Sequence, residues 1–294
     1  MKVRTMLETI TSLLGTPACA IPLSCCRPVK SYLLDRAGIS QVGTAILFAV
    51  PYLMTADVAA PARNLSLYAV SRDYHGYMQE LSKEVLPILR ERFPAHTFAL
   101  FADHSPICEV DAAARAGLGV LGVNGLLITP DFGSFVFLGE VVTDAPYETV
   151  VGSVRPVFPV QPPMCERCGA CLGACPAGCV GGVDRGTCLS AVTQKKGDLS
   201  PEEIAAMVRN GLVWGCDTCQ LVCPHNQRII REGRDTPLPY FREKRLPYLS
   251  TEILDAMTDE EFSSRAYAWR GRAVIRRNAK LWEKHSTDHE RRKP

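Results

Sequence analysis

The stretch that decides the fold of this chain runs from residue 165 to residue 224. Its first part reads Cys165-Glu-Arg-Cys168-Gly-Ala-Cys171-Leu-Gly-Ala-Cys175-Pro176, and its last part reads Cys216-Asp-Thr-Cys219-Gln-Leu-Val-Cys223-Pro224. Cysteines spaced by two, two and three residues before a proline are typical of thiolates that bind a [4Fe–4S] cluster. The second part has the same form when Cys188, upstream of it, supplies the missing first cysteine. The spacing therefore predicts two [4Fe–4S] clusters.

In paired clusters of this bacterial ferredoxin type, the fourth cysteine of each run binds the other cluster. One cluster is then predicted to take Cys165, Cys168, Cys171 and Cys223, and the other Cys188, Cys216, Cys219 and Cys175. Structural zinc is the alternative, because zinc also binds pairs of cysteines two residues apart. Zinc requires neither a third cysteine at that spacing nor a fourth one before proline. A disulfide framework fits short secreted chains better than this one.

The length of 294 residues and a hydrophobic content of 47% allow a sizeable core in about two domains. The net charge of +2 says nothing about partners. Between residues 265 and 294, however, ten Lys and Arg stand against three acidic residues, a local excess of seven. This basic segment is interpreted either as a solvated surface helix or as a site that binds RNA or phosphate.

No segment of the sequence predicts a membrane span or an export signal. Residues 37–56 carry no charge, but only residues 45–50 form an uninterrupted apolar run, whereas a spanning helix needs about 20 apolar residues. Glu8 interrupts the apolar start of the chain. We expect a cytoplasmic protein in a reducing compartment, with Cys19, Cys25 and Cys26 as ordinary small apolar residues.

Hydrophobic periodicity predicts an α+β fold in which strands alternate with helices. Helices are predicted over residues 6–14, 64–93, 109–115 and 273–284, with another beginning at Ser200, and strands over 44–50, 97–102, 126–129 and 134–142. Five prolines between residues 146 and 163 indicate a linker and a domain boundary.

Polar residues follow the predicted strand at 97–102 directly, in the order Asp103-His104-Ser105-Pro106. In open α/β sheets, ligands bind just past the carboxyl ends of strands, although the same residues also form turns. Glu140 lies within a predicted apolar strand, where a carboxylate needs a partner. Residues 117–125 are glycine-rich without a phosphate-binding motif, and such glycines allow the backbone to approach a large flat ligand.

Taken together, the motifs resemble the cobalamin-dependent epoxyqueuosine reductases of transfer-RNA modification, over residues 42–281. The matching segments are Ser71-Arg-Asp-Tyr-His75, Asp103-x-x-Pro106, Ala116-Gly-Leu-Gly119 with Gly122 and Asn124, Gly133-Ser-Phe-Val-Phe-Leu-Gly-Glu140, the cluster cysteines, Cys188-Leu-Ser-Ala-Val-Thr193 and Gly215-Cys-Asp-Thr-Cys-Gln-Leu-Val-Cys-Pro-His-Asn226. The last segment and the one ending at Glu140 are the most specific.

The resemblance implies a nitroreductase-like α/β corrinoid-binding domain over residues 1–150, a ferredoxin-like double [4Fe–4S] domain over 151–230, and a short basic helical segment over 231–294. It implies that Asp103 donates a proton to the departing epoxide oxygen, while the clusters relay electrons to cobalt. A buried Asp beside a macrocycle is expected to have a raised pKa. The implied corrinoid contacts are Arg72, Tyr74, His75, Ser105, Gly122, Asn124, Ser134, Phe135, Gly139 and Glu140.

The resemblance also implies partners: a flavodoxin- or ferredoxin-type electron donor and transfer RNA, which the basic C-terminal helix would touch. We expect a monomer. The sequence ends where the family usually continues into helical repeats, and Val123 stands where the family commonly has Lys. Three alternatives therefore stay open: a double-cluster electron carrier that turns nothing over, a corrinoid reductase acting on a substrate other than transfer RNA, and a nucleic-acid-binding protein with structural clusters.

Overall fold

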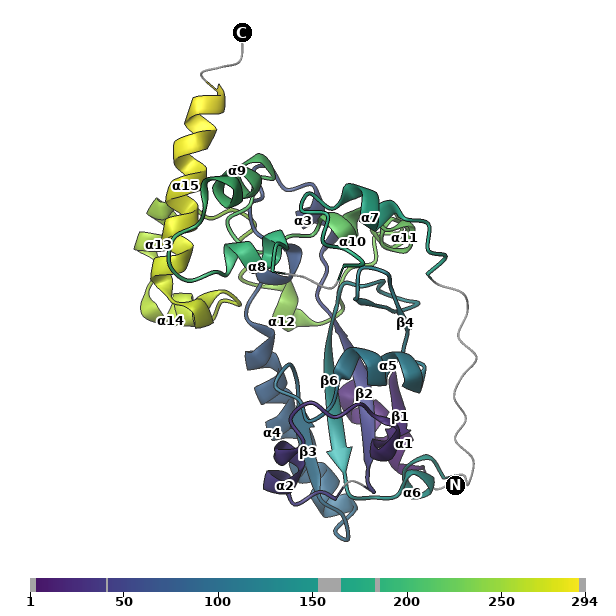
Figure 1. Ribbon diagram of the computed structural model, residues 1–294. Helices are drawn as coiled ribbons and strands as arrows, with labels where there is room; N and C mark the ends of the chain where they lie inside the picture. The colour runs from purple at the N-terminus through teal and green to yellow at the C-terminus, as the bar shows by residue number, and fades with distance from the viewer. Residues whose placement is uncertain (1–3, 41, 153–164, 183–185, 291–294) are drawn as a thin grey trace. The chain divides into compact units, whose positions relative to one another are not determined.

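The computed structural model (Figure 1) describes residues 4–40, 42–152, 165–182 and 186–290. The chain forms two compact units. The first comprises residues 1–51, 75–122 and 126–166, and the second comprises residues 52–74, 123–125 and 167–294. Residues 52–74, which the sequence analysis placed in the first domain, thus group with the cysteine-rich part of the chain. Most of the predicted linker lies outside the described residues.

The first unit is built on a four-stranded sheet in the order β1-β2-β6-β3, with bounds β1 Ala18–Pro22, β2 Thr44–Pro51, β3 Phe98–Phe101 and β6 Val136–Thr143. All eight residues of β2 are buried, as expected for a continuous apolar run in a central strand. Every pairing in this sheet is antiparallel. The rule for carboxyl ends of parallel strands, which drew attention to Asp103, therefore does not apply here.

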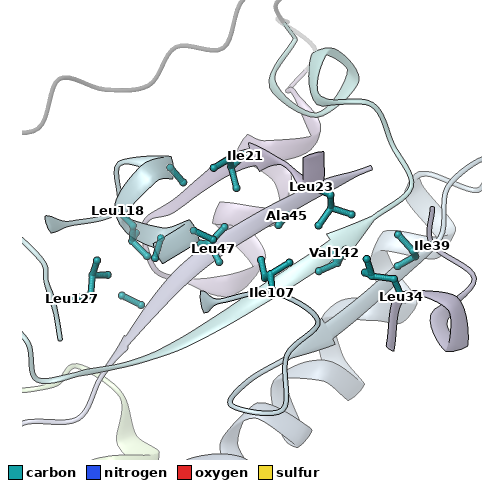
Figure 2. Close-up of a cluster of buried hydrophobic side chains, with 14 residues drawn as sticks. Ile21, Leu23, Leu34, Ile39, Ala45, Leu47, Ile107, Leu118, Leu127 and Val142 are labelled. Carbon is teal, nitrogen blue, oxygen red and sulfur yellow. The ribbon is translucent and has the colours of Figure 1, made fainter. Parts of the chain in front are cut away.

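Helix α5 (Glu109–Ala116) packs on β1, β2 and β6 and ends at Gly117, whose φ of 90° is readily adopted by glycine. Its alanines let the helix approach the sheet closely, because they add little bulk at the contact. The core beneath it, shown in Figure 2, is a single apolar cluster: Ile21, Leu23, Leu34, Ile39, Ala45, Leu47, Ala49, Ile107, Ala112, Ala113, Ala116, Leu118, Leu127 and Val142. This core fixes the ends of β3 and α5, between which Asp103 lies.

The remaining elements of the first unit are short, apart from one helix. They are α1 Met6–Leu14, η1 Leu23–Cys25, α2 Tyr32–Ala37, the hairpin of β4 Val120–Leu121 and β5 Leu127–Ile128, and α6 Tyr147–Val151. The predicted helix at 6–14 and the helix at 109–115 are confirmed. Strand β1 was not predicted, because its residues lie in a proline-rich stretch that gives no alternating pattern.

The long helix predicted over residues 64–93 is wrong in its first third. Helix α4 runs only from Tyr74 to Arg92, and the preceding segment contains one turn, η2 Leu67–Ala69. In that segment the backbone N–H of Ser66 donates to the carbonyl of Trp214 at 2.8 Å, and Leu65 forms a bridge with the same residue. These tertiary hydrogen bonds replace helical ones, so the helical spacing of apolar residues here reflects burial rather than a helix.

The second unit is helical. Its elements are α3 Thr55–Val58, α7 Ala170–Ala174, α8 Leu189–Thr193, α9 Pro201–Arg209, α10 Thr218–Leu221, α11 Pro224–Arg231, α12 Pro239–Arg242, α13 Thr251–Ala256, α14 Asp259–Ser263, η3 Ala268–Arg270 and α15 Arg272–Glu290. The helix predicted to begin at Ser200 is confirmed as α9, and Ser200 and Glu203 form a capping box at its start. Helix α15 confirms the predicted basic C-terminal helix. Among the described residues, no helix is both long and apolar enough to cross a membrane.

Two apolar clusters hold the second unit together. The larger surrounds the fully buried Trp214 and Tyr267, whose rings meet edge to face at 6.2 Å. The smaller joins α8 and α9 through Leu189, Val192 and Met207. Both clusters adjoin the segment that carries Cys188 and Cys216, so the cysteine-bearing loops start from packed elements.

Candidate functional site

Asp103 stands on a strained turn directly after β3. Its φ of 62° lies in the left-handed region, which costs a non-glycine residue on the order of 1 kcal/mol or more. The turn is closed by the N–H of His104, which donates to the carbonyl of Ala102 at 2.6 Å. The N–H of Asp103 donates to Oε1 of Glu109 at 2.9 Å, so the first residue of α5 anchors the loop. The Asp103 carboxylate itself is 72% exposed.

The carboxylate of Asp103 faces a histidine. Nε2 of His75, in the first turn of α4, lies 3.7 Å from Oδ2 of Asp103. The interaction with His75 is the largest of several causes that lower the pKa of Asp103, and the charges of Lys30 and His104 act in the same direction. The expected raised pKa applies to an Asp buried beside a macrocycle and stays a prediction, because here the Asp103 side chain is exposed and its pKa is lowered. At neutral pH Asp103 is an exposed carboxylate among basic groups.

A basic rim surrounds this loop. Nζ of Lys30 donates to Nδ1 of His104 at 2.9 Å, and the Tyr32 hydroxyl lies 3.3 Å from Nε2 of the same ring. The segment that carries Lys30 is held in place because the N–H groups of Val29 and Lys30 both donate to the carbonyl of Pro106. Exposed cationic and hydroxyl donors beside a carboxylate suit an anionic or oxygen-rich ligand.

Behind the loop lies a buried carboxyl group. Glu140 on β6 is fully buried, and its Oε1 lies 2.5 Å from Oγ of Ser105. Oγ of Ser105 also accepts from the N–H of Ile107 at 3.1 Å and lies 2.8 Å from the carbonyl of the same residue. The one hydrogen of the Ser105 hydroxyl is therefore shared between Oε1 of Glu140 and this carbonyl.

The surroundings of Glu140 favour its protonated form, although the hydrogen bond from Ser105 opposes that shift. Burial is the main cause that raises the pKa of Glu140 well above its ordinary value, and the nearby Glu109 carboxylate raises it further. Burial likewise raises the pKa of Glu109. The predicted partner of Glu140 is therefore Ser105, and a chain of polar groups connects Glu140 through Glu109 to the backbone of Asp103.

The other residues implied to contact the corrinoid are divided between the two units. Gly122 closes the hairpin by donating to the carbonyl of Leu126, and Gly139 packs on the Phe48 ring, where an added Cβ would lie 2.4 Å from a ring carbon. Ser134 and Phe135 are buried. Arg72, Tyr74 and Asn124 group with the second unit. In that unit the Arg72 guanidinium stacks on Tyr240, 3.8 Å from the ring centroid.

A surface hollow of about 360 Å³ adjoins His75. Its lining combines polar and apolar side chains from α4 and from the end of β3: His75, Met78, Gln79, Ser82, Lys83, Leu100 and Ala102. This volume is at the small end of ligand pockets.

We call the second cluster the one predicted to bind Cys175, Cys188, Cys216 and Cys219, all of which lie in the second unit. The thiols of Cys188 and Cys216 are electrostatic neighbours of Cys219, and burial raises the pKa of Cys219 to about 12. Sγ of Cys175 lies 3.6 Å from Sγ of Cys179, which also interacts with Cys188. The cysteines are free thiols, the donors that a [4Fe–4S] cluster requires.

The pairing of Cys165, Cys168, Cys171 and Cys223 stays a prediction. Cys171 lies on α7, which packs against α10, the helix that carries Cys219. Cys223 precedes α11, whose first residue is Pro224, so the proline begins a helix and turns the chain after the cysteine. Within the described residues, no three Cys, His, Asp or Glu side chains form a ready-made site for a single ion.

One residue that matters here was not singled out from the sequence. Asp217, between two predicted ligands, is buried and accepts three hydrogen bonds: from Arg63 Nη1 at 2.8 Å, Ser66 Oγ at 2.5 Å and the N–H of Leu67 at 2.9 Å. Burial raises the pKa of Asp217, and the Arg63 guanidinium opposes that shift. The only sequence signal was its place between Cys216 and Cys219.

The loop before Asp217 is equally constrained. Gly215 has a φ of 73°, and a Cβ there would lie 2.4 Å from Cβ of Ser66. Its N–H donates to Oγ1 of Thr193 at 2.9 Å. Asn278 of α15 donates to the carbonyls of Thr193 and Val213, at 2.7 and 2.9 Å. These contacts fix the backbone from which Cys216 and Cys219 project.

Comparison with known proteins identifies the cysteine region first. Residues 164–226 match the family model of the 4Fe-4S double cluster binding domain, which supports two clusters over zinc. The epoxyqueuosine reductase of Listeria monocytogenes is 36% identical over 213 residues, covering 70% of this chain and 53% of the relative. That of Escherichia coli is 34% identical over 208 residues, covering 67% and 50%. The chain thus spans about half the length of the curated relatives it matches.

The fold is also shared. The structure of epoxyqueuosine reductase from Streptococcus thermophilus matches with a TM-score of 0.73 at 23% identity, covering 96% of this chain and 81% of that one. The Bacillus subtilis structure matches with a TM-score of 0.71 at 25% identity, covering 95% and 80%. In sequence and in fold, the chain is similar to epoxyqueuosine reductases over most of its length.

Proposed function

We propose that this chain is a cobalamin-dependent iron–sulfur reductase that converts epoxyqueuosine to queuosine in transfer RNA. The observation that carries the proposal is the Asp103 loop, which presents an exposed carboxylate on a strained backbone beside His75. Strained backbone clusters at functional sites. One related structure is described with its catalytic aspartate loop swung out of the active site, and another with an epoxyqueuosine-modified tRNA-Tyr stem loop.

The proposed reaction requires the protein to supply electrons and protons. Removing the epoxide oxygen as water, and leaving an alkene, consumes two electrons and two protons. Asp103 gives a proton to the departing oxygen, which would otherwise leave as a poorly stabilised alkoxide. Since the pKa of Asp103 is lowered, it needs a neighbour that returns a proton to it, and His75 at 3.7 Å is placed to do so. On this proposal a proton passes from His75 to Asp103 and from Asp103 to the departing oxygen.

A bound corrinoid supplies the cobalt that reduces the substrate. The hollow beside His75 is too small for a whole corrinoid, so such a group would rest on exposed side chains such as His75 and Asp103. Ser105, Ser134, Phe135 and Glu140 are buried, which favours a supporting role for them over direct contact. Ser105 and Glu140 would hold the Asp103 loop in shape from behind.

Two further parts of the proposal concern partners. The clusters take single electrons from a flavodoxin- or ferredoxin-type donor in the cytoplasm and pass them toward the corrinoid. The RNA backbone is attracted by the basic rim at Lys30 and by the basic helix α15.

The proposal is tested with anaerobically purified, reconstituted protein. Cobalamin binding is followed by absorbance, and turnover of an epoxyqueuosine-containing stem loop by mass spectrometry. We expect binding and product, with product lost in Asp103→Asn and retained in His96→Ala, a matched control whose imidazole lies 3.3 Å from Asp144. Absence of corrinoid binding would refute the proposal. Reversible electron transfer by the clusters without any turnover would instead support an electron carrier.

A further inference from the structure

The cysteine-rich segment contains a ninth cysteine that neither predicted ligand set uses. Cys179 is 8% exposed, and its Sγ lies 3.6 Å from Sγ of Cys175. The same thiol is within hydrogen-bonding reach of Cys188. Cys179 therefore contacts two of the four residues predicted to bind the second cluster, and it is directed into the unit rather than to solvent.

The backbone gives Cys175 and Cys179 equivalent places. The carbonyl of Cys175 accepts from the N–H of Gly178 at 3.0 Å, and the carbonyl of Cys179 accepts from the N–H of Gly182 at 3.3 Å. Each cysteine thus opens one of two consecutive turns. Gly178 has a φ of 60°, a conformation that glycine adopts without strain, and a Cβ there would meet nothing within 4 Å. The segment between the two cysteines is short and unobstructed.

We propose that Cys179 is an alternative iron ligand of the second cluster, able to take the place of Cys175. A thiolate is the group that binds iron, and both side chains are thiols whose Sγ atoms lie 3.6 Å apart. In the exchange, Cys179 loses its proton and binds iron, while Cys175 leaves the same iron and takes up a proton. No electron is transferred. The cluster then has two ligation states, which differ in the hydrogen bonding at the ligand sulfur and hence in potential.

The test compares cluster content in alanine variants, because a serine oxygen could itself bind iron. After anaerobic reconstitution, Cys175→Ala is expected to keep about eight iron atoms per chain, about four for each cluster. The double variant Cys175→Ala/Cys179→Ala is expected to keep about four. Electron paramagnetic resonance of the reduced proteins should show two clusters in the first variant and one in the second.

Cys219→Ala is the matched control, because Cys219 has Cys216 and Cys188 as neighbours rather than Cys179. It is expected to lose the second cluster although Cys179 is present. If Cys175→Ala loses as much iron as Cys219→Ala, the proposal is wrong.

A second measurement does not depend on Cys175→Ala folding. Cys179→Ala alone should keep both clusters and shift the midpoint potential of one of them. If this variant loses a cluster, Cys179 is an obligatory ligand rather than an alternative one. If the midpoint potentials of both clusters stay unchanged, the Cys179 thiol does not bind either cluster. Either result overturns the proposal.

Discussion

Asp103 and Asp217 lie in different units of the chain and differ in exposure, in hydrogen bonding and in the direction of their pKa shift. Asp103 is 72% exposed, sits on a left-handed backbone, donates its N–H to Glu109 and lies 3.7 Å from His75. Asp217 is buried and accepts from Arg63, Ser66 and Leu67. Interaction with His75 lowers the pKa of Asp103, whereas burial raises that of Asp217.

The difference separates a carboxylate that can react from one that holds a loop. A buried carboxylate that accepts three hydrogen bonds cannot reach a substrate, and the interactions of an exposed one contribute little to stability. Asp217 therefore secures the backbone between Cys216 and Cys219, and Asp103 is free to move a proton. Replacing Asp217 should therefore lower stability and iron content, whereas replacing Asp103 should lower turnover.

The largest effect is expected for Asp217→Ala. The substitution removes the carboxylate that pairs with the partly buried Arg63 guanidinium, which keeps its hydrogen bond to the carbonyl of Leu65, and it leaves two further donors without their acceptor. The free energy of unfolding should therefore fall by about 3–5 kcal/mol. Because the loop carries Cys216 and Cys219, the second cluster should be lost as well. Urea unfolding and iron analysis of the reconstituted protein measure the two effects.

Asp255→Ala serves as the control for that experiment. Asp255 forms a two-point ion pair with Arg276, but both side chains are more than two-fifths exposed. Its loss should cost less than about 1 kcal/mol and no iron. Equal losses in the two variants would contradict the view that burial distinguishes Asp217.

Asp103→Asn tests the other side of the comparison. Cluster content and the free energy of unfolding should stay as in the wild type, because the anchoring hydrogen bond uses the backbone N–H of residue 103. On the proposed function, turnover should fall by about 10²–10⁴-fold, the usual contribution of a general acid. A variant that turns over normally would remove Asp103 from the mechanism.

The sequence predicted the cysteine region and the central strands because each has a local signature. The cysteine spacing follows from cluster geometry, and β2 is a continuous apolar run. The burial of residues 64–73 was not predictable in the same way, since it depends on Trp214, about 150 positions away in the chain. The apolar spacing of that segment therefore suggested a helix that tertiary hydrogen bonds exclude.

In the candidate site, too, the sequence did not predict properties that depend on residues distant in the chain. Ser71 to His75 and Asp103 could be picked out by resemblance, but the lowered pKa of Asp103 comes from His75, which approaches from another element. Asp217 carries no pattern of its own, and only its three donors, brought in from residues 63–67, reveal its role. Partners distant in sequence set the chemistry of a carboxylate.

A smaller effect on stability is expected for Glu140→Gln, which replaces the buried carboxyl group of β6. A folded pKa above the unfolded one means that the contribution of Glu140 to stability is full below its ordinary pKa of 4.5 and is lost as the pH rises through the raised value. Glutamine keeps a side-chain oxygen that accepts from Ser105, and it does not titrate. Urea unfolding across pH 5–9 should show less loss of stability at high pH in the variant. Parallel curves for variant and wild type would mean that Glu140 is ionised when folded.

The smallest effect concerns the His75–Asp103 pair itself. The histidine is the largest cause that lowers the pKa of Asp103, so His75→Ala should move that pKa upward, toward its ordinary value. Carbon-13 NMR titration of the Asp103 carboxyl measures the shift directly, with Asp103→Asn identifying the signal and His96→Ala as the control. Because the carboxylate is mostly exposed, solvent screens the interaction, and stability should barely change. A pKa that stays where it was would leave Lys30 and His104 as the groups that hold Asp103 ionised, and the returning proton would then have to come from His104.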